Sequence, residues 1–258
     1  MSAAIITRDG VADQFGDPAR VYELASVTKP LVAYAVLVAV EEGAVELDDP
    51  AGPSGSTLAH LLSHASGLAY DTREVEAPPG EQRIYSSAGF EVASEVVAEA
   101  TGIEFGRYLS EAVCAPLEMS STTLYGPAGH AARSSVADLA AFARELLDPR
   151  LLAPETFGTL TSVRFPGLDG FVPGYGKHRP NDWGIGFEIR SEKSPHWTGT
   201  RNSPRTFGHF GQSGTYLWVD PELAAACVVL TDRPFGAWAK PLWTEFNDAV
   251  VDTLVADD

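Results

Sequence analysis

The sequence predicts an α/β (α+β) fold in which an antiparallel sheet is flanked by helices and a mostly helical lobe is inserted between its strands. Strand-like segments occur near the start of the chain and again in its last third, whereas helical patterns fill most of the middle. Short turns at residues 211–214 and 220–222 join the later strands, which is typical of an antiparallel meander. This order predicts an α/β lobe from about residues 1–30 and 183–258 and a helical lobe of about residues 31–182, within one domain.

Local patterns indicate each element. Two short strands are expected at residues 4–7 and 21–24, separated by turns at Asp9-Gly10 and Gly16-Asp17-Pro18. The later strands are expected at residues 185–189, 206–210, 215–219 and 224–231. The expected helices span residues 26–42, a short segment that ends near residue 62, and residues 88–100, 105–113, 135–147 and 238–255. Glycine and proline are dense between residues 166 and 180, which predicts a long loop of the kind that is often functional.

The charge balance argues against a nucleic-acid partner. The chain has 258 residues, with 18 Lys and Arg against 35 Asp and Glu, so its formal net charge is −17. A field of that sign repels phosphate backbones and anionic membrane surfaces. A small-molecule substrate is therefore the expected partner, and the sequence carries no signal for an oligomeric state.

The sequence shows no pattern typical of a membrane span or a metal centre. The longest apolar run, residues 31–40, is too short to cross a bilayer, and no signal peptide is recognisable, so a cytoplasmic location is expected. Cys114 and Cys227 cannot form a four-thiolate site, although they leave a single disulfide open. The six histidines lack metal-ligand spacing. Neither a metal nor another cofactor is expected.

The strongest candidate for chemistry is Ser26-Val27-Thr28-Lys29, at the start of the long apolar helix. A spacing of three residues places Ser26 and Lys29 on one helical face. A serine hydroxyl needs a base to become a nucleophile, and a buried lysine can serve because burial lowers its pKa. Taken alone, the same pattern also describes a serine N-cap followed by an incidental lysine.

Two further segments are candidates. Tyr85 precedes a helix in Tyr85-Ser86-Ser87, and a tyrosine near a lysine can act as a general base or relay because the cation lowers its pKa. His209 lies in a glycine-flanked strand that ends in Gly211-Gln212, where backbone N–H groups can face a substrate. Each segment taken alone is better explained by a structural role.

Taken together and in this order, the motifs give a specific resemblance. From about Leu24 to Arg233, the chain resembles the serine hydrolase superfamily of class C β-lactamases, D-Ala-D-Ala peptidases and related esterases. The resemblance rests on the segments LASVTKP (24–30), LLSHASGL (61–68), PG (79–80), YSS (85–87), APLEM (115–119), HFG (209–211) and LTDR (230–233). It implies a β-lactamase/transpeptidase-like catalytic domain formed by the whole chain.

The resemblance also implies a role for each matching residue. Ser26 would be the acylated nucleophile, Lys29 would take its proton alone or with Tyr85, and Tyr85 would serve the leaving group and the deacylating water. The backbone N–H groups of Ser26 and Gln212 would form the oxyanion hole.

Further matching positions imply contacts with the substrate. Ser87, His209 and Gly211 would contact the substrate, and His64 would be structural rather than catalytic. Ser87 replaces the usual Asn of the second motif, and His209 replaces the usual Lys of the third.

These departures favour an esterase-like serine hydrolase that acts on a small ester, amide or lactam. A short Ser87 and a neutral His209 would hold a β-lactam less firmly than an asparagine and a lysine. A transacylase that passes the acyl group to an amine, a β-lactamase or D,D-peptidase, and a catalytically silent binding protein remain alternatives. Aromatic residues near the Gly/Pro-rich segment are expected either to line the pocket or to cover the sheet: Phe171, Tyr175, Trp183 and Trp197.

Overall fold

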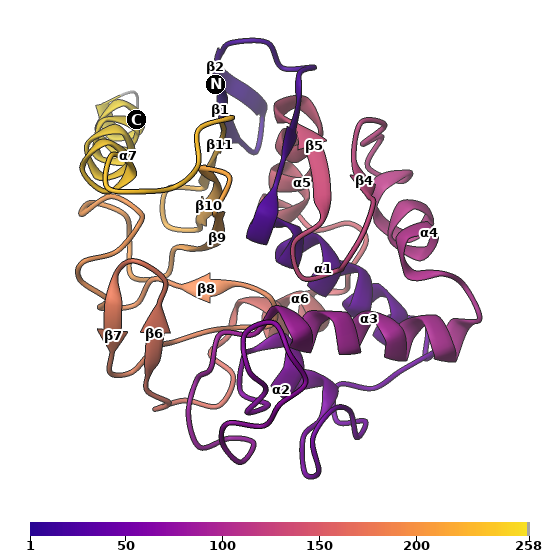
Figure 1. Ribbon diagram of the computed structural model, residues 1–258. Coiled ribbons are helices and arrows are strands. Elements are labelled where there is room, and N and C mark those ends of the chain that lie inside the picture. The colour runs from indigo at the N-terminus through magenta and orange to yellow at the C-terminus, as the bar shows by residue number, and fades with distance from the viewer. Residues whose placement is uncertain (257–258) are drawn as a thin grey trace.

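The computed structural model describes residues 1–256, and its architecture confirms the predicted fold class. A six-stranded antiparallel sheet has the order β2-β1-β11-β10-β9-β8. Its strands are β1 (Ser2–Thr7), β2 (Gly10–Phe15), β8 (Glu188–Ile189), β9 (Phe207–Gly211), β10 (Thr215–Asp220) and β11 (Ala225–Leu230). Strands from the two ends of the chain pair directly, since Ala4 of β1 lies opposite Val228 of β11. Both termini therefore lie at the same end of the molecule (Figure 1).

The two faces of the sheet bury different side chains. On β10, Tyr216 and Trp218 belong to one core cluster, whereas Leu217 and Val219 belong to the other. This alternation follows from the two-residue repeat of a strand. The aromatic side packs against the C-terminal helix α7 (Ala239–Ala256), and the aliphatic side packs against α5 (Val136–Leu147) and α1 (Thr28–Glu41) (Figure 1).

The helical part of the molecule surrounds α1. That helix is buried on almost every side, which explains its nearly uninterrupted apolar run. A one-turn 3₁₀ helix, η1 (Ala25–Val27), leads directly into it. The remaining helical segments are α2 (Leu58–Leu62), α3 (Ser87–Thr101), α4 (Phe105–Leu109), the π-helical turn η2 (Ser110–Cys114) and α6 (Pro154–Thr161).

Capping residues define one end of each of three helices. Thr57 caps α2 by accepting a hydrogen bond, Ser135 Oγ accepts a hydrogen bond from the N–H of Asp138 at the start of α5, and Gly102 ends α3 in the left-handed region. The helix expected over residues 105–113 is instead split, because the backbone switches from α to π geometry at Ser110.

Some predicted boundaries differ from the structure. The segment expected to be a long loop contains a hairpin of β6 (Gly170–Val172) and β7 (Gly176–His178). The strand expected at residues 185–189 is reduced to β8, because Gly186 adopts a positive φ of 78°. The strand expected at residues 21–24 is β3 (Val21–Glu23), but it lies outside the main sheet. It forms a small antiparallel sheet with β5 (Ala132–Ser135) and β4 (Thr123–Leu124), in the order β3-β5-β4. Helix α5 was expected in the helical lobe, but it packs on the main sheet.

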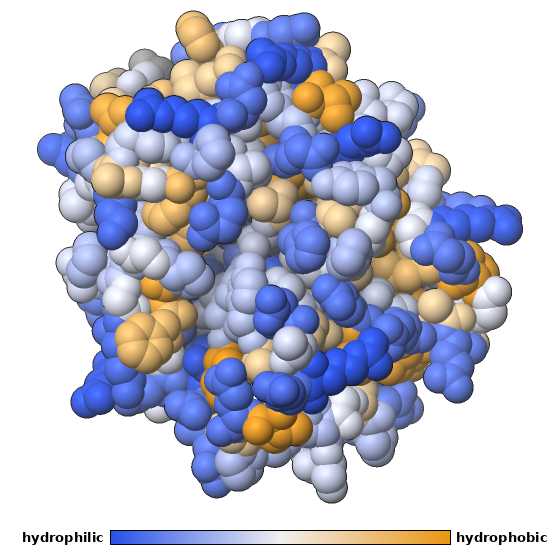
Figure 2. Space-filling model, viewed as in Figure 1, coloured by the Kyte–Doolittle hydropathy of each residue, from blue (hydrophilic) through white to orange (hydrophobic). Residues whose placement is uncertain are grey.

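The surface reflects the composition. Hydrophilic side chains dominate the face seen in Figure 2, with hydrophobic residues scattered among them. Within residues 1–256, no helix is both long and apolar enough to span a bilayer. Cys114 and Cys227 are buried free thiols.

Candidate active site

Ser26 lies in a strained turn just before α1. The preceding residue, Ala25, has a φ of 47°, a region that a residue with a Cβ rarely adopts, at a cost of about 1–3 kcal/mol. Neighbouring strands hold this turn: the N–H of Leu24 donates to the carbonyl of Ala132, and the hydroxyl of Thr215 donates to the carbonyl of Leu24. The turn thus presents a nearly buried serine at the junction of α1 and the main sheet.

Lys29 contacts Ser26 from one turn further along the chain. Its Nζ lies 3.4 Å from Ser26 Oγ, and the whole side chain is inaccessible to solvent. Burial lowers the pKa of Lys29 from 10.5 to about 7, although the Glu91 carboxylate opposes the shift. A large part of the protein therefore carries a neutral amine at physiological pH. Such an amine can accept the proton of the Ser26 hydroxyl.

Two other groups fix the amine in place. Nζ lies 2.7 Å from the carbonyl oxygen of Gly129 and 3.0 Å from Ser87 Oγ. Gly129 is required there, because a Cβ on it would come within 2.7 Å of Ser87 Cβ. When Lys29 is neutral, its two N–H groups can serve these acceptors, and its lone pair is left for Ser26.

Tyr85 and His209 form the other side of the site. The Tyr85 hydroxyl lies 3.4 Å from His209 Nε2, and His209 Nδ1 lies 2.7 Å from the carbonyl oxygen of Phe210. A carbonyl only accepts, so Nδ1 carries the proton and Nε2 presents a lone pair to Tyr85. Burial, reinforced by the Lys29 charge, lowers the pKa of His209 to about 3. His209 is therefore a neutral acceptor.

The protonation state of Tyr85 differs from the sequence-based expectation. The nearby lysine was expected to lower its pKa, but burial raises the pKa of the phenol, and a contact with the Ser26 hydroxyl opposes this effect only weakly. Lys29 instead lies over the Tyr85 ring, with Nζ 4.7 Å from its centroid. Tyr85 thus remains a neutral hydroxyl that can donate a proton.

His64 supports Tyr85 by packing. Its ring centroid lies 4.5 Å from that of Tyr85 and 4.5 Å from the ring of Trp183. Its Nδ1 accepts a hydrogen bond from the N–H of Ser86, next to Tyr85. These contacts make His64 a positioning residue rather than a residue at the reacting atoms, which is how the sequence motif was interpreted.

Ser26 opens onto two pockets, which we call inner and outer. The inner pocket, of about 50 Å³, is lined by Ser26, Tyr70, Tyr85, Pro173, Trp183, Glu188, His209, Phe210 and Gln212. The outer pocket, of about 420 Å³, is lined by Glu23, Ala25, Ser26, Tyr70, Tyr125, His130 and Gln212. Among the described residues, no lysine or arginine lines either pocket, but each pocket has a glutamate in its wall.

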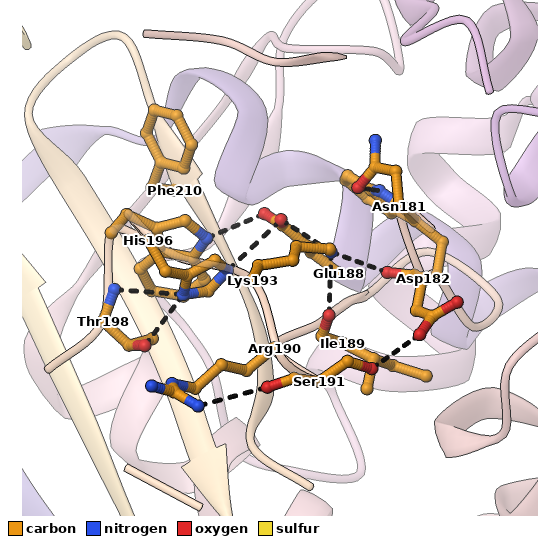
Figure 3. A network of polar contacts seen from close by, with 12 residues as sticks. Asn181, Asp182, Glu188, Ile189, Arg190, Ser191, Lys193, His196, Thr198 and Phe210 are labelled. Atoms are coloured by element: carbon orange, nitrogen blue, oxygen red, sulfur yellow. Dashed lines mark hydrogen bonds and ion pairs between the residues drawn. The ribbon is translucent and has the colours of Figure 1, made fainter. Parts of the chain in front are cut away.

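Glu188 is a site residue that the sequence analysis missed. It is buried, and Lys193 and His196 contact its carboxylate (Figure 3). The indole Nε1 of Trp197 also donates a hydrogen bond to it. The attraction of Lys193 and His196 outweighs the effect of burial and holds the pKa of Glu188 far below its usual value. The available signal was a lone acidic residue in the apolar segment of residues 185–189.

Some of the residues that were predicted to contact the substrate line a pocket, and others do not. Gln212 lines both pockets directly after β9, and His209 lines the inner one. Ser87 lines neither pocket within the described residues; its Oγ faces Lys29. Gly211 lies against the turn that carries Ser26, because a Cβ on it would come within 2.4 Å of the carbonyl oxygen of Leu24.

The four candidate aromatic residues occupy different environments. Trp183 lines the inner pocket. Trp197 and Tyr175 lie in the core on the aromatic side of the sheet, and Phe171 is exposed on the β6–β7 hairpin. Only Trp183 therefore has a direct place at the site. Among residues 1–256, no cluster of three or more His, Cys, Asp or Glu side chains is arranged to hold a metal.

Comparison with known proteins identifies the family. A family model described as Beta-lactamase matches residues 3–251. The chain belongs to the beta-lactamase family. A crystal structure of a beta-lactamase from Mycobacterium bovis is 58% identical, with a TM-score of 0.97, and the match covers 98% of this chain and 94% of that one. This beta-lactamase-family chain therefore shares both sequence and fold with a solved relative along nearly its whole length.

Curated relatives of this beta-lactamase-family chain are more distant. Penicillin-binding protein 4* of Bacillus subtilis is 24% identical over 40% of this chain and 30% of its own length. The match thus spans about a third of that relative. Esterase EstB of Burkholderia gladioli is 25% identical over 93% of this chain and 86% of its own length. Together, these findings support a serine hydrolase of the beta-lactamase family.

Proposed function

We propose that this protein is an esterase-like hydrolase that works through an acyl-enzyme on Ser26. The observation that carries the proposal is the buried Lys29 amine, 3.4 Å from Ser26 Oγ and with a pKa lowered to about 7. An amine with this pKa is close to the ideal general base at neutral pH. The strained turn at Ala25 and the hydrogen bonds that hold it keep Ser26 facing the two pockets.

In the proposed reaction, neutral Lys29 takes the proton of Ser26 as its Oγ attacks the ester carbonyl. The N–H groups of Ser26 and Gln212 stabilise the resulting oxyanion. The Tyr85 hydroxyl turns from His209 to the leaving oxygen, gives it a proton, and recovers one from Lys29. In the second half, the same pair takes a proton from the water that attacks the acyl-enzyme. The bond between the acyl carbon and Ser26 Oγ then breaks, the pair returns the proton to Oγ, and the acid is released.

The charges in the site favour esters over β-lactams. Penicillins and cephalosporins carry a carboxylate, which a cation normally holds. Here His209 is neutral with an acceptor facing the site, no lysine or arginine lines either pocket within residues 1–256, and Ser87 faces Lys29 instead of the pocket. A small ester needs none of these contacts, because its leaving group departs easily.

The test compares covalent labelling and turnover. Wild-type protein and the Ser26→Ala variant are treated with a fluorophosphonate probe, and kcat/KM is measured for 4-nitrophenyl acetate, a chromogenic cephalosporin and a D-alanyl peptide. We expect the ester to be the best substrate, and Ser26→Ala to lose both labelling and turnover while its circular dichroism is unchanged. Ser63→Ala, a buried serine outside both pockets, is the matched control.

Other outcomes would identify the alternatives. A preference for the cephalosporin would assign a β-lactamase activity, which the description of the Mycobacterium bovis relative names for that protein. Acceleration of product release by an added amine, with formation of the amide, would identify a transacylase. Absence of labelling in the wild type would indicate a silent binding protein and overturn the proposal.

A further inference from the structure

The inner pocket contains a carboxylate that the proposed chemistry does not use. Glu188 is 2% exposed, yet it lines the inner pocket together with Ser26, Tyr85 and His209. A network of polar side chains contacts this carboxylate (Figure 3). A buried carboxylate beside a reacting serine needs an explanation in terms of function.

The network leaves one acceptor position unused. Oε1 of Glu188 lies 2.9 Å from Lys193 Nζ and 3.2 Å from His196 Nε2, whereas Oε2 lies 2.8 Å from Trp197 Nε1. A carboxylate oxygen can accept two hydrogen bonds, so Oε2 has capacity for one more. Within the described residues, Trp197 Nε1 is the one protein donor to Oε2, and Glu188 lies in the wall of the inner pocket.

The network also fixes the position of the carboxylate. Nζ of Lys193 is fixed by the carbonyl oxygens of Asp182 and Ile189, each at 2.8 Å, in addition to Glu188. His196 is fixed through its Nδ1 by Thr198 at 2.8 Å. Lys193 compensates the charge of Glu188, so the carboxylate stays ionised while its position is set within the fold.

We propose that Glu188 determines specificity by selecting esters whose leaving group carries a hydrogen-bond donor, either a hydroxyl or an ammonium group. This inference rests on the proposed esterase function. It deepens that function by naming the class of leaving group: a small amino alcohol or diol.

The leaving group, rather than the acyl group, occupies the inner pocket. Tyr85 is the proposed proton donor to the leaving oxygen, and Tyr85 and His209 line the inner pocket but not the outer one. The acyl group then extends into the larger outer pocket, between Tyr70, Tyr125 and His130. A donor a few bonds beyond the leaving oxygen meets Oε2 of Glu188, whereas a carboxylate there meets a like charge.

The experiment uses matched acetate esters. The esters of 2-(dimethylamino)ethanol, protonated at pH 7, and of 3-methylbutanol have nearly the same shape and differ in charge and donor. The esters of ethylene glycol and 1-propanol form the corresponding neutral pair, and the ester of glycolic acid supplies the anion. Each kcat/KM is divided by the rate of alkaline hydrolysis of that ester, so that differences in leaving-group reactivity cancel.

We expect the donor-bearing ester of each pair to be preferred about ten- to a hundredfold, the scale of one hydrogen bond to a charged group. The glycolate ester should be the poorest substrate. In Glu188→Gln/Lys193→Met, which removes both charges, the preference for the ammonium ester should fall towards one. Lys177→Met, which removes a half-exposed cation from β7 outside both pockets, serves as the control and should keep the wild-type ratio.

The outcomes separate the two proposals. If all the esters are hydrolysed with equal normalised rates, or if the double variant keeps the full preference, the role of Glu188 is overturned and the esterase function stands. If none is hydrolysed and the fluorophosphonate probe does not react, the proposed function fails first. If the double variant does not fold, the wild-type ratios decide alone.

Discussion

The Tyr85 hydroxyl donates its hydrogen bond to Nε2 of His209, 3.4 Å away, because Nδ1 of that ring is committed to the carbonyl of Phe210. The direction of this hydrogen bond determines which atom of each partner carries a proton. His209 cannot offer a proton to a substrate from Nε2, and its pKa of about 3 keeps it neutral. Tyr85 keeps its proton until a leaving group competes for it.

This pairing predicts how the substrate preference can be changed. In Ser87→Asn/His209→Lys, the ratio of kcat/KM for 4-nitrophenyl acetate to that for a cephalosporin should fall by about one to two orders of magnitude. The new ammonium group supplies a charge-assisted contact worth about 1.5–3 kcal/mol for the cephalosporin carboxylate. His209→Gln is the matched control without a cation. An unchanged ratio in the double variant would contradict the electrostatic explanation.

A second prediction concerns pH. If neutral Lys29 is the base, kcat/KM for an ester should rise with pH through an apparent pKa of about 7 and level off above it. Glu91 raises the pKa of Lys29, so Glu91→Gln should shift the rise to lower pH. Glu95→Gln, on the same helix but paired with Arg73 at the surface, should leave the profile in place. A profile that is flat between pH 5 and 9 would exclude Lys29 as the base.

A third prediction tests whether Lys29 and Tyr85 act on the same proton. Lys29→Met and Tyr85→Phe should each slow acylation at least about a hundredfold, the usual contribution of general acid–base catalysis. The double variant should be little slower than the worse single variant, because the two groups form one relay. Single-turnover rates of acylation by an alkyl acetate, whose leaving oxygen must be protonated, provide the measurement. Fully additive losses would mean that the two residues act independently.

The sequence alone can predict only those contacts in the active site that join residues close together in the chain. Ser26 and Lys29 are one helical turn apart, so their contact follows from helix geometry alone. Tyr85 and His209 are far apart in the chain, and only the motif resemblance placed them at one site. Glu188 was not predicted as a site residue, because its burial as a carboxylate depends on contacts with Lys193 and His196. Both residues lie in a segment without regular structure, so no sequence pattern predicts these contacts.

The fold shows the same division between local and long-range information. Short strand-like segments separated by turns predicted β9, β10 and β11 closely. Strand β2 is an exposed edge in which apolar and polar side chains follow no regular order, so no pattern predicted it. The β6–β7 hairpin was interpreted as a loop because Gly174 and Gly176, which both adopt a positive φ there, are also typical of loops.

A fourth prediction concerns the contact between β9 and the turn that carries Ser26. In Gly211→Ala, the new Cβ would overlap the carbonyl oxygen of Leu24, so the strand must move away from that turn. We expect a loss of about 1–3 kcal/mol in the free energy of unfolding and a larger relative loss of kcat. Gly158→Ala, in the α6 helix with no atom within 4 Å of the new Cβ, should be neutral or slightly stabilising. Equal behaviour of both variants would show that the contact does not position Ser26.

The pairing of β1 with β11 has a consequence for how the protein is made. Strand β1 leaves the ribosome long before β11 exists, and the loop to be closed runs from the end of β1 to the start of β11. The helices of the middle segment can form early because their contacts are local. The turn that carries Ser26 is braced by Thr215 and Gly211, so it reaches its final shape only when the last strands arrive. The geometry at Ser26 is therefore complete only after β9 and β10 have been synthesised and have packed against this turn.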